Sequence, residues 1–182
     1  GLRHRVQRSG FTMPAGVVSA NLKDYKSPLK KSLAPHQSII LNGYMADAPT
    51  WDDLVWLQKN TSLAILIKGI LAPEDAIHAK KLGFQGIVVS NHGGRNLDCV
   101  PASSDCLAKI RAAVGPDYLV LFDSGIRRGS DIFKALALGA DAVLVGRPYI
   151  YALSIAGALG VAHCLKILID EFEITMALAG CP

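Results

Sequence analysis

The chain has 182 residues, of which 51% are hydrophobic, and carries a formal net charge of +4 at neutral pH. This length is enough for one sizeable hydrophobic core and short for two ordinary domains. The basic residues are scattered or paired, without a long basic stripe or interleaved aromatic residues, which argues against nucleic-acid binding.

The first third of the chain reads as a long connection followed by one helix. Residues 11–50 lack a sustained hydrophobic period and are rich in Pro, Gly and Ser, which predicts a mobile loop region. Within it, residues 23–31 carry four lysines, which favours a solvated loop and leaves contact with an anionic membrane surface as the alternative. Residues 50–60 predict a helix with Thr50 as its N-cap. Its apolar side chains are expected to pack on the rest of the domain, namely Trp51, Leu54, Val55 and Leu57.

From Leu63 onward, a short apolar stretch that ends in glycine and a polar or charged residue occurs four times. The four stretches are AILIKG (64–69), GIVVSNHG (86–93), YLVLFDSG (118–125) and AVLVGRP (142–148). Continuous apolar runs of this length are typical of strands buried on both faces of a parallel sheet.

Helix signals follow each of these strands. The expected helices cover residues 71–83 (Pro73 in the first turn, Gly83 as the stop), 103–115 (Ser103 or Ser104 as N-cap), 129–140 (Ser130 as N-cap) and about 162–179. This βα alternation predicts an α/β fold with a parallel sheet and right-handed crossovers. Its functional site is expected at the carboxyl ends of the strands.

The cysteines and the apolar stretches give expectations about the environment. Cysteines at positions 99, 106, 164 and 181 form no CxxC pair and no metal-ligand spacing, which predicts reduced thiols, no metal site and a protein that is not secreted. Each strand-like stretch meets Gly, Lys or Asp within eight residues, so no transmembrane segment is predicted.

Two glycine–arginine turns follow the last two strands, in DSGIRRG (123–129) and GRP (146–148). Glycine lets backbone N–H groups come close to an anion, and arginine supplies a planar fork of donors. Helix N-termini after these turns would add partial positive charge. Because the loops after the last two strands of (β/α)₈ barrels commonly bind phosphate, the turns favour a phosphate-bearing ligand over two solvated surface turns.

Three further side chains lie at strand ends. His92 and Arg95 flank Gly93 and Gly94, so a tight turn can direct both side chains into one cavity as a base beside a carboxylate-binding guanidinium. Lys68 ends the first of the four strands. The sequence leaves open whether Lys68 pairs with a carboxylate, lies beside an electron-accepting cofactor or acts as a Schiff-base amine.

Together, these motifs resemble the FMN-dependent α-hydroxy acid oxidase/dehydrogenase family. The resemblance rests on IKG, SNHGGRNLD and DSGIRRGSDIFKALALGADAVLVGRP, in that order and spacing, and on DEFEITMALAGC (170–181) as the family's last helix. The DSG at 123–125 departs from the DGG of plant-type members.

The resemblance implies roles for the residues nearest the substrate. His92 would take a proton from an L-2-hydroxy acid of the lactate, glycolate or mandelate type as electrons pass to the flavin. Arg95 would bind the substrate carboxylate with help from Arg3. Asp98 would either orient Arg95 or cap the loop, and both alternatives stay open.

The resemblance also implies an FMN site. Lys68 would lie beside N1 and O2 of the isoalloxazine ring, and Ser90 would hydrogen-bond the flavin. The ribityl and phosphate positions would be Asp123 and Gly125 for the ribityl chain, and Arg127, Gly146 and Arg147 for the phosphate.

By the same resemblance, the chain supplies strands five to eight and the last helix of a (β/α)₈ TIM barrel, with residues 11–50 as the loop after strand four. The missing half, which would hold the substrate-binding tyrosines and the aspartate that pairs with the histidine, is expected from a partner chain, a cleaved piece or a segment outside these residues. A homotetramer in the cytoplasm is expected, with a peroxisomal or peripheral-membrane setting as alternatives. Another FMN barrel, such as an isopentenyl diphosphate isomerase-like enzyme, and a non-catalytic half-barrel are the competing hypotheses.

Overall fold

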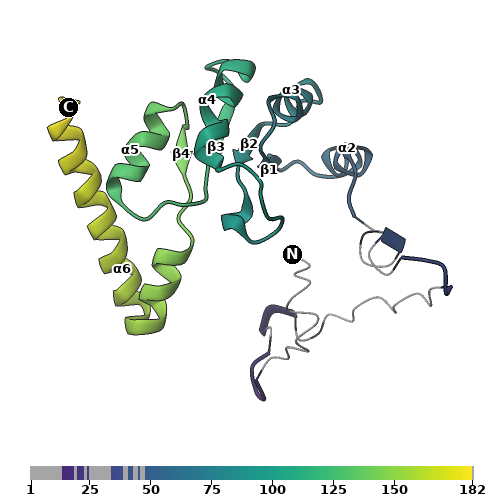
Figure 1. The fold of residues 1–182 in the computed structure, drawn as a ribbon, viewed down its shortest axis with the longest axis horizontal. Coiled ribbons are helices and arrows are strands. Elements are labelled where there is room, and N and C mark those ends of the chain that lie inside the picture. Colours follow the sequence, from purple (N-terminus) through teal and green to yellow (C-terminus); the bar gives the residue numbers. More distant parts are fainter. Residues whose placement is uncertain are drawn as a thin grey trace. The chain divides into compact units, whose positions relative to one another are not determined.

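The computed structural model describes residues 14–18, 20–22, 24, 34–38, 41–42, 45 and 48–181. The chain divides into two units, Leu2–Ser62 and Leu63–Pro182 (Figure 1). Most of the predicted loop region 11–50, including residues 23–31 apart from Asp24, lies outside the described residues. The described part of that region includes the short helix η1 (Ala20–Leu22).

The predicted capped helix of the first unit is confirmed as α2 (Trp51–Lys59). Its N-cap is Thr50, whose backbone N–H donates to the Asp53 carboxylate at 2.7 Å, while Thr50 Oγ1 accepts from the Asp53 N–H at 3.4 Å. This reciprocal capping box satisfies two of the helix's otherwise unpaired donors. The predicted packing of its apolar side chains on the other unit stays a prediction.

The second unit contains the predicted parallel sheet. Its strands are β1 (Leu66–Ile70), β2 (Gly86–Val89), β3 (Leu119–Phe122) and β4 (Ala142–Val143), and they lie in the order β1-β2-β3-β4. All three pairings are parallel. The consecutive order makes β1 and β4 the outer strands of the described sheet (Figure 1). Because all the pairings are parallel, the four strand ends that carry the motifs lie along one side of the sheet.

Helices connect and follow these strands as the sequence predicts. They are α3 (Pro73–Lys81), α4 (Ser103–Val114), α5 (Gly129–Ala137) and α6 (Arg147–Leu178), with a short helix η3 (His92–Gly94) directly after β2. The core lies between the sheet and α3 and α4, where Ile87, Leu107, Ile110 and Val120 are fully buried. Complete burial of one such side chain contributes about 1.5–3 kcal/mol.

Two predicted helix caps are wrong. The N-cap of α4 is Ala102, because Ser103 is already helical and its hydroxyl accepts the backbone N–H of Asn91 at 3.0 Å. The N-cap of α5 is Arg128 rather than Ser130. Here the carboxylate of Asp131, in the third helical position, reaches back to the N–H groups before the helix.

The last helix starts earlier than predicted, at Arg147 rather than near residue 162. Ala156 and Gly157 have non-helical backbone angles, with a φ of 57° at Gly157, so α6 consists of two helical segments joined at a kink. The sequence does not predict the first segment, because its β-branched and aromatic residues and the glycine at the kink have low helix propensity.

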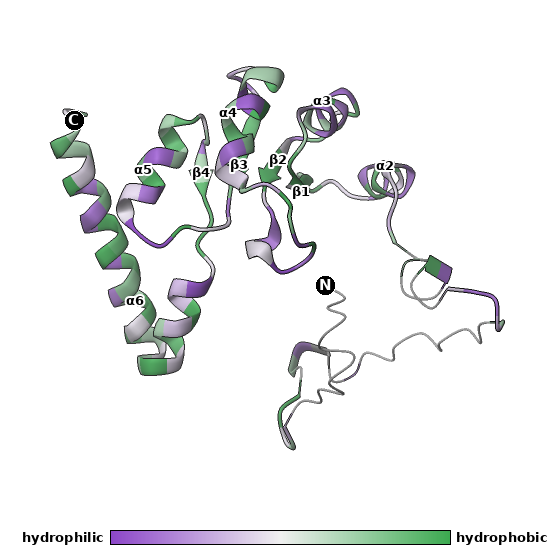
Figure 2. Ribbon diagram, in the orientation of Figure 1, coloured by the Kyte–Doolittle hydropathy of each residue, from purple (hydrophilic) through white to green (hydrophobic). Residues whose placement is uncertain are grey.

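The prediction that no segment is long and apolar enough to cross a membrane is also corrected. By length and composition, α6 meets that criterion. Only 6% of its most apolar 18-residue stretch is buried in the structure. Figure 2 shows the helix coloured mostly as hydrophobic. Glycines follow the strands elsewhere in this unit, whereas Gly157 and Gly160 lie between and within the helical segments of α6.

The N-terminal side of the sheet is held by Arg111 of α4. Its guanidinium donates to the carbonyl oxygens of Gly139 at 2.6 Å and Tyr118 at 2.7 Å, and pairs with Asp141 at 2.7 Å. The same Asp141 oxygen accepts the backbone N–H of Val120. Arg111 thus joins the segments that enter β3 and β4, on the side opposite the predicted site.

Candidate active site

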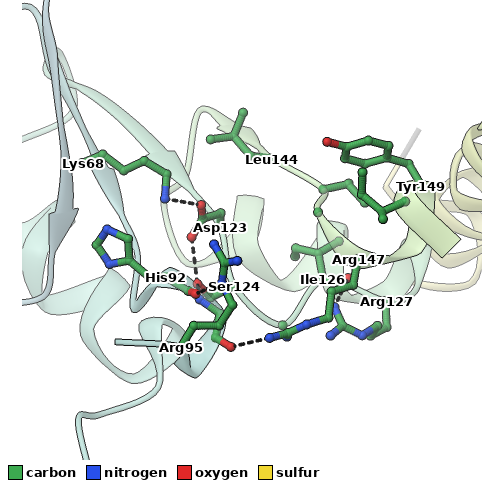
Figure 3. Close-up of a pocket in the computed structure, with 15 residues that line it drawn as sticks. Lys68, His92, Arg95, Asp123, Ser124, Ile126, Arg127, Leu144, Arg147 and Tyr149 are labelled. Atoms are coloured by element: carbon green, nitrogen blue, oxygen red, sulfur yellow. Dashed lines mark hydrogen bonds and ion pairs between the residues drawn. The ribbon is translucent and has the colours of Figure 1, made fainter. Parts of the chain in front are cut away.

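A cavity of about 420 Å³ lies at the carboxyl ends of the strands. Its volume is in the range of small-molecule sites, roughly 300–1,000 Å³. The ionisable and glycine residues that line it are Lys68, His92, Gly93, Arg95, Asp123, Gly125, Arg127, Gly146 and Arg147, and the others are Ser124, Ile126, Leu144, Val145, Tyr149 and Ile150 (Figure 3).

An ion pair joins the ends of β1 and β3. Lys68 Nζ lies 2.6 Å from Asp123 Oδ2 and donates to Ser90 Oγ at 2.8 Å, and Ser124 Oγ donates to the other Asp123 oxygen at 2.8 Å (Figure 3). Partial burial disfavours the charged carboxylate, but hydrogen bonds from Lys68, Ser90 and Ser124 and the Lys68 charge outweigh it and lower the pKa of Asp123. Asp123 is therefore an anion at neutral pH, and of the three ammonium donors of Lys68 one remains for a ligand.

The turn after β2 has an unusual backbone. His92, Gly93 and Gly94 have φ values of 58°, 67° and 67°, a region that glycine adopts readily and histidine rarely. The His92 N–H donates to Ser90 Oγ at 3.1 Å, and the Gly94 N–H donates to the Asn91 side chain at 3.1 Å. These hydrogen bonds hold the turn in a form that brings His92 to the cavity.

Arg95 reaches the same cavity from the end of this turn. Its Nε donates to the backbone carbonyl of His92 at 3.1 Å, so its guanidinium folds back over the turn rather than extending away from it. The structure therefore brings the predicted base and the predicted carboxylate-binding arginine to the wall of one cavity.

The two glycine–arginine turns form the other side of the cavity. Arg127 donates to the carbonyl of Ile126 at 2.9 Å, and Arg147 donates to the carbonyl of Gly93 at 2.8 Å. At Gly125 and Gly146, a Cβ atom would meet nothing within 4 Å, so a ligand can approach these backbones closely.

The two helix N-termini near these turns differ, which revises the expectation that both attract an anion. At α5, the Asp131 carboxylate accepts the N–H groups of Arg127 and Arg128, and the Glu171 carboxylate accepts that of Gly129 at 2.9 Å. The first turn of α5 is thus already matched with two carboxylates. No side chain caps the start of α6 at Gly146, and this turn lines the cavity.

The structure does not place Ser90, a predicted flavin contact, in the cavity wall. Ser90 is fully buried behind it, where its hydroxyl accepts hydrogen bonds from Lys68 and His92. Arg3 lies outside the described residues. Ser124, Leu144 and Tyr149 also line the cavity, although the sequence did not predict them as site residues. Ser124 lies inside the DSG motif and Tyr149 directly follows GRP, so the motifs themselves point to both positions.

No group of three or more potential metal ligands is found among the residues that the structure describes. All four cysteines have free thiols.

The model of the FMN-dependent dehydrogenase family matches residues 1–182, the whole chain. The chain belongs to this family.

Similar proteins agree with this assignment. The chain is 55% identical to an L-lactate oxidase of Alicycliphilus denitrificans over 96% of its length, and 45% identical to a peroxisomal (S)-2-hydroxyacid oxidase of Arabidopsis thaliana over 91%. A structure of a mandelate oxidase variant with (S)-mandelic acid matches all of the chain with a TM-score of 0.80 and 43% identity. The four-stranded parallel sheet is thus part of a TIM barrel, as the resemblance predicted.

The chain spans about half the length of the relatives it matches. It covers 48% of the lactate oxidase, 47% of the plant oxidase and 48% of the mandelate oxidase chain. In a TIM barrel of eight strands, half of the chain corresponds to the four strands found here.

Proposed function

We propose that this chain forms the FMN- and substrate-binding half of a barrel that oxidises a small L-2-hydroxy acid to the 2-oxo acid. The observation that carries the proposal is that five side chains line one cavity. They are His92, Arg95, Lys68 and the two arginines of the glycine–arginine turns, Arg127 and Arg147. The family assignment supports this hypothesis over an isopentenyl diphosphate isomerase-like barrel, because the similar proteins are named as lactate, glycolate and mandelate oxidases.

The residues present fit FMN. The cavity wall carries four cationic side chains, those of Lys68, Arg95, Arg127 and Arg147, against the single carboxylate of Asp123, which is already paired with Lys68. An uncapped helix start and two open glycine backbones lie beside the arginines, as a phosphate group requires. Arg127, Gly146 and Arg147 would hold the phosphate, and Asp123 and Gly125 the ribityl chain.

The isoalloxazine ring would lie near Lys68, whose ammonium is fixed by Asp123 and Ser90 and keeps one donor for the ring edge. Bound FMN would supply the electron acceptor, taking two electrons from the substrate carbon. Ser90 supports this site from behind, through Lys68 and His92, because it is fully buried.

The substrate side of the site rests on two residues of the turn after β2. The Arg95 guanidinium would bind the substrate carboxylate through two parallel hydrogen bonds, and Arg3 is proposed as its helper. The His92 imidazole would take the hydroxyl proton as the substrate is oxidised, because imidazole is the side chain that most often serves as a general base. The substrate leaves as the 2-oxo acid after losing two electrons and two protons.

The other four strands are proposed to come from polypeptide outside these 182 residues. Among the residues that the structure describes, β1 and β4 have no further strand beside them, and large apolar side chains of α6 are exposed, whereas a closed barrel has no open strand edges. Through the family, we also propose a homotetramer in the cytoplasm, with a peripheral-membrane setting or, in a eukaryote, a peroxisomal one as the alternatives. Two of the plant relatives are named as peroxisomal.

Replacing His92 by Gln tests the proposal. In the FMN-loaded protein with its barrel complete, we expect the flavin to stay bound and its reduction by L-lactate, glycolate or mandelate to slow by about 10²–10⁴-fold, the range for loss of a general base. The measurement is the rate at which the yellow absorbance bleaches under anaerobic conditions.

His163→Gln is the matched control, since His163 is an exposed histidine of α6. It should reduce its flavin at the normal rate. If His92→Gln retained most of the activity, His92 would not be the base. A protein that stays colourless with FMN and the completing polypeptide would instead favour a non-catalytic half-barrel.

A further inference from the structure

The peptide of Gly93, next to the proposed base His92, is held from two other strand ends. Its N–H donates to Ser124 Oγ at 3.0 Å, and its carbonyl accepts from Arg147 Nη2 at 2.8 Å (Figure 3). Ser124 follows β3 and Arg147 follows β4. The turn that carries His92 is therefore fixed by its neighbours in the sheet as well as by its own hydrogen bonds.

Ser124 occupies a backbone position that favours glycine. Its φ is 79°, a conformation that is uncommon and strained for a residue with a Cβ atom. A glycine would adopt the same conformation without this cost. A serine at this position therefore needs an interaction of its side chain to offset the strain.

The hydroxyl of Ser124 provides that interaction by bridging two parts of the site. It donates to Asp123 Oδ1 at 2.8 Å and accepts from the Gly93 N–H at 3.0 Å, so both its donor and an acceptor site are used. Through Asp123 it is joined to Lys68, 2.6 Å away from the second carboxylate oxygen. One chain of hydrogen bonds thus runs from the ammonium at β1, through β3, to the turn after β2.

The turn needs such support because His92 itself has a φ of 58°. A histidine in this conformation persists when the surrounding structure holds it there, and its backbone position decides where the imidazole lies. A shift of about 1 Å in a catalytic group can cost on the order of 100-fold in rate.

We propose that Ser124 is a positioning residue for His92. Its hydroxyl couples the Lys68–Asp123 ion pair to the Gly93 peptide and so holds the imidazole in place for proton removal. This inference rests on the proposed function, in which His92 is the base.

Two substitutions separate the hydroxyl from the backbone conformation. Ser124→Ala removes the hydroxyl and keeps the strained φ, whereas Ser124→Gly removes both. In the FMN-loaded protein with its barrel complete, we expect both variants to slow flavin reduction by L-lactate about tenfold, as loss of one hydrogen bond in a linked network does. The substrate Kd should stay close to that of the parent protein because Arg95 is unchanged. The flavin content should also stay the same because Arg127 and Arg147 are unchanged.

Stability distinguishes positioning from a merely structural role. Ser124→Gly should melt at a higher temperature than Ser124→Ala, because glycine relieves the strain, yet both should be equally slow. Ser104→Ala, an exposed serine at the start of α4, is the control and should behave as the parent protein.

A second readout tests whether Ser124 acts through His92. In the His92→Gln background, Ser124→Ala should slow flavin reduction no further, because residues that act as a unit have non-additive effects. A further tenfold loss there, parental rates in both single variants, or a loss in Ser124→Ala that Ser124→Gly restores would each overturn the inference. A parent protein that binds FMN but is reduced by no 2-hydroxy acid would instead overturn the proposed function, and this inference with it.

Discussion

At the scale of single residues, the site depends on a close contact between two strand ends. Gly69 follows Lys68 at the end of β1, and a Cβ atom there would lie 2.7 Å from Cε1 of the His92 imidazole. Gly69 also has a φ of 102°, which residues with a side chain rarely adopt. The backbone of β1 therefore forms the surface against which the proposed base lies. Position 69 requires glycine for two reasons, because a side chain would collide with the imidazole and because the backbone φ is positive.

Gly69→Ala is expected to displace the imidazole and to slow substrate oxidation by up to about 100-fold, with some loss of stability from the strained φ. Steady-state kinetics of the FMN-loaded protein and its melting temperature check this. Gly115→Ala is the matched control, because Gly115 has a φ of 80° but open space at the Cβ position. It should lose stability and keep its rate. Equal rates in the two variants would show that the imidazole does not depend on Gly69.

At the scale of elements, α6 is joined to α5 by a backbone contact that leaves no room for a side chain. A Cβ atom on Gly129 would lie 2.1 Å from the backbone nitrogen of Phe172. Beside it, the Glu171 carboxylate accepts the Gly129 N–H at 2.9 Å and pairs with Arg128 at 3.1 Å. Glu171 accepts a hydrogen bond from the first turn of α5, so this turn is not available to bind an anion. We therefore expect the phosphate of the proposed cofactor to bind at the start of α6 and to Arg127 and Arg147.

Gly129→Ala should destabilise the protein through overpacking between α5 and α6, by about 1–3 kcal/mol. The expected result is a lower melting temperature and weaker FMN retention, because Arg127, two residues before Gly129, lines the cavity. Thermal unfolding and flavin release on dilution measure the two effects. Ser130→Ala, one residue further along α5, should change neither, and a parental melting temperature for Gly129→Ala would contradict the contact.

At the scale of the whole molecule, the second unit contains four of the eight strands of a (β/α)₈ barrel. In the part of the chain that the structure describes, the sheet has four strands and both outer strands lack a neighbour on one side. Several apolar side chains of α6 are strongly exposed, with exposed fractions of 84% at Ile155, 81% at Leu159 and 85% at Leu178. Exposed edges and contiguous apolar surfaces promote association. The isolated chain should therefore associate with other copies more readily than a closed barrel does.

The 182-residue chain alone is expected to self-associate and to bind the dye ANS, and both properties should fall when the N-terminal half of a related oxidase is co-expressed with it. Light scattering after size exclusion and dye fluorescence are the measurements. A double variant, Ile155→Glu with Leu159→Glu, should lower the self-association of the isolated chain. An isolated chain that is monomeric and binds no dye would contradict the half-barrel proposal.

The sequence by itself determined the alternation of strands and helices, the parallel sheet and most of the cavity residues, because apolar runs and glycine stops are local signals. It also determined the family, through motifs that lie at strand ends. Only the tertiary structure decided that α5 is capped by Glu171, that Ser124 tethers the His92 turn, and that Ser90 lies behind the cavity rather than in its wall. These features depend on hydrogen bonds between residues 31 or more positions apart, or on burial by distant elements, and no local pattern of residues encodes them.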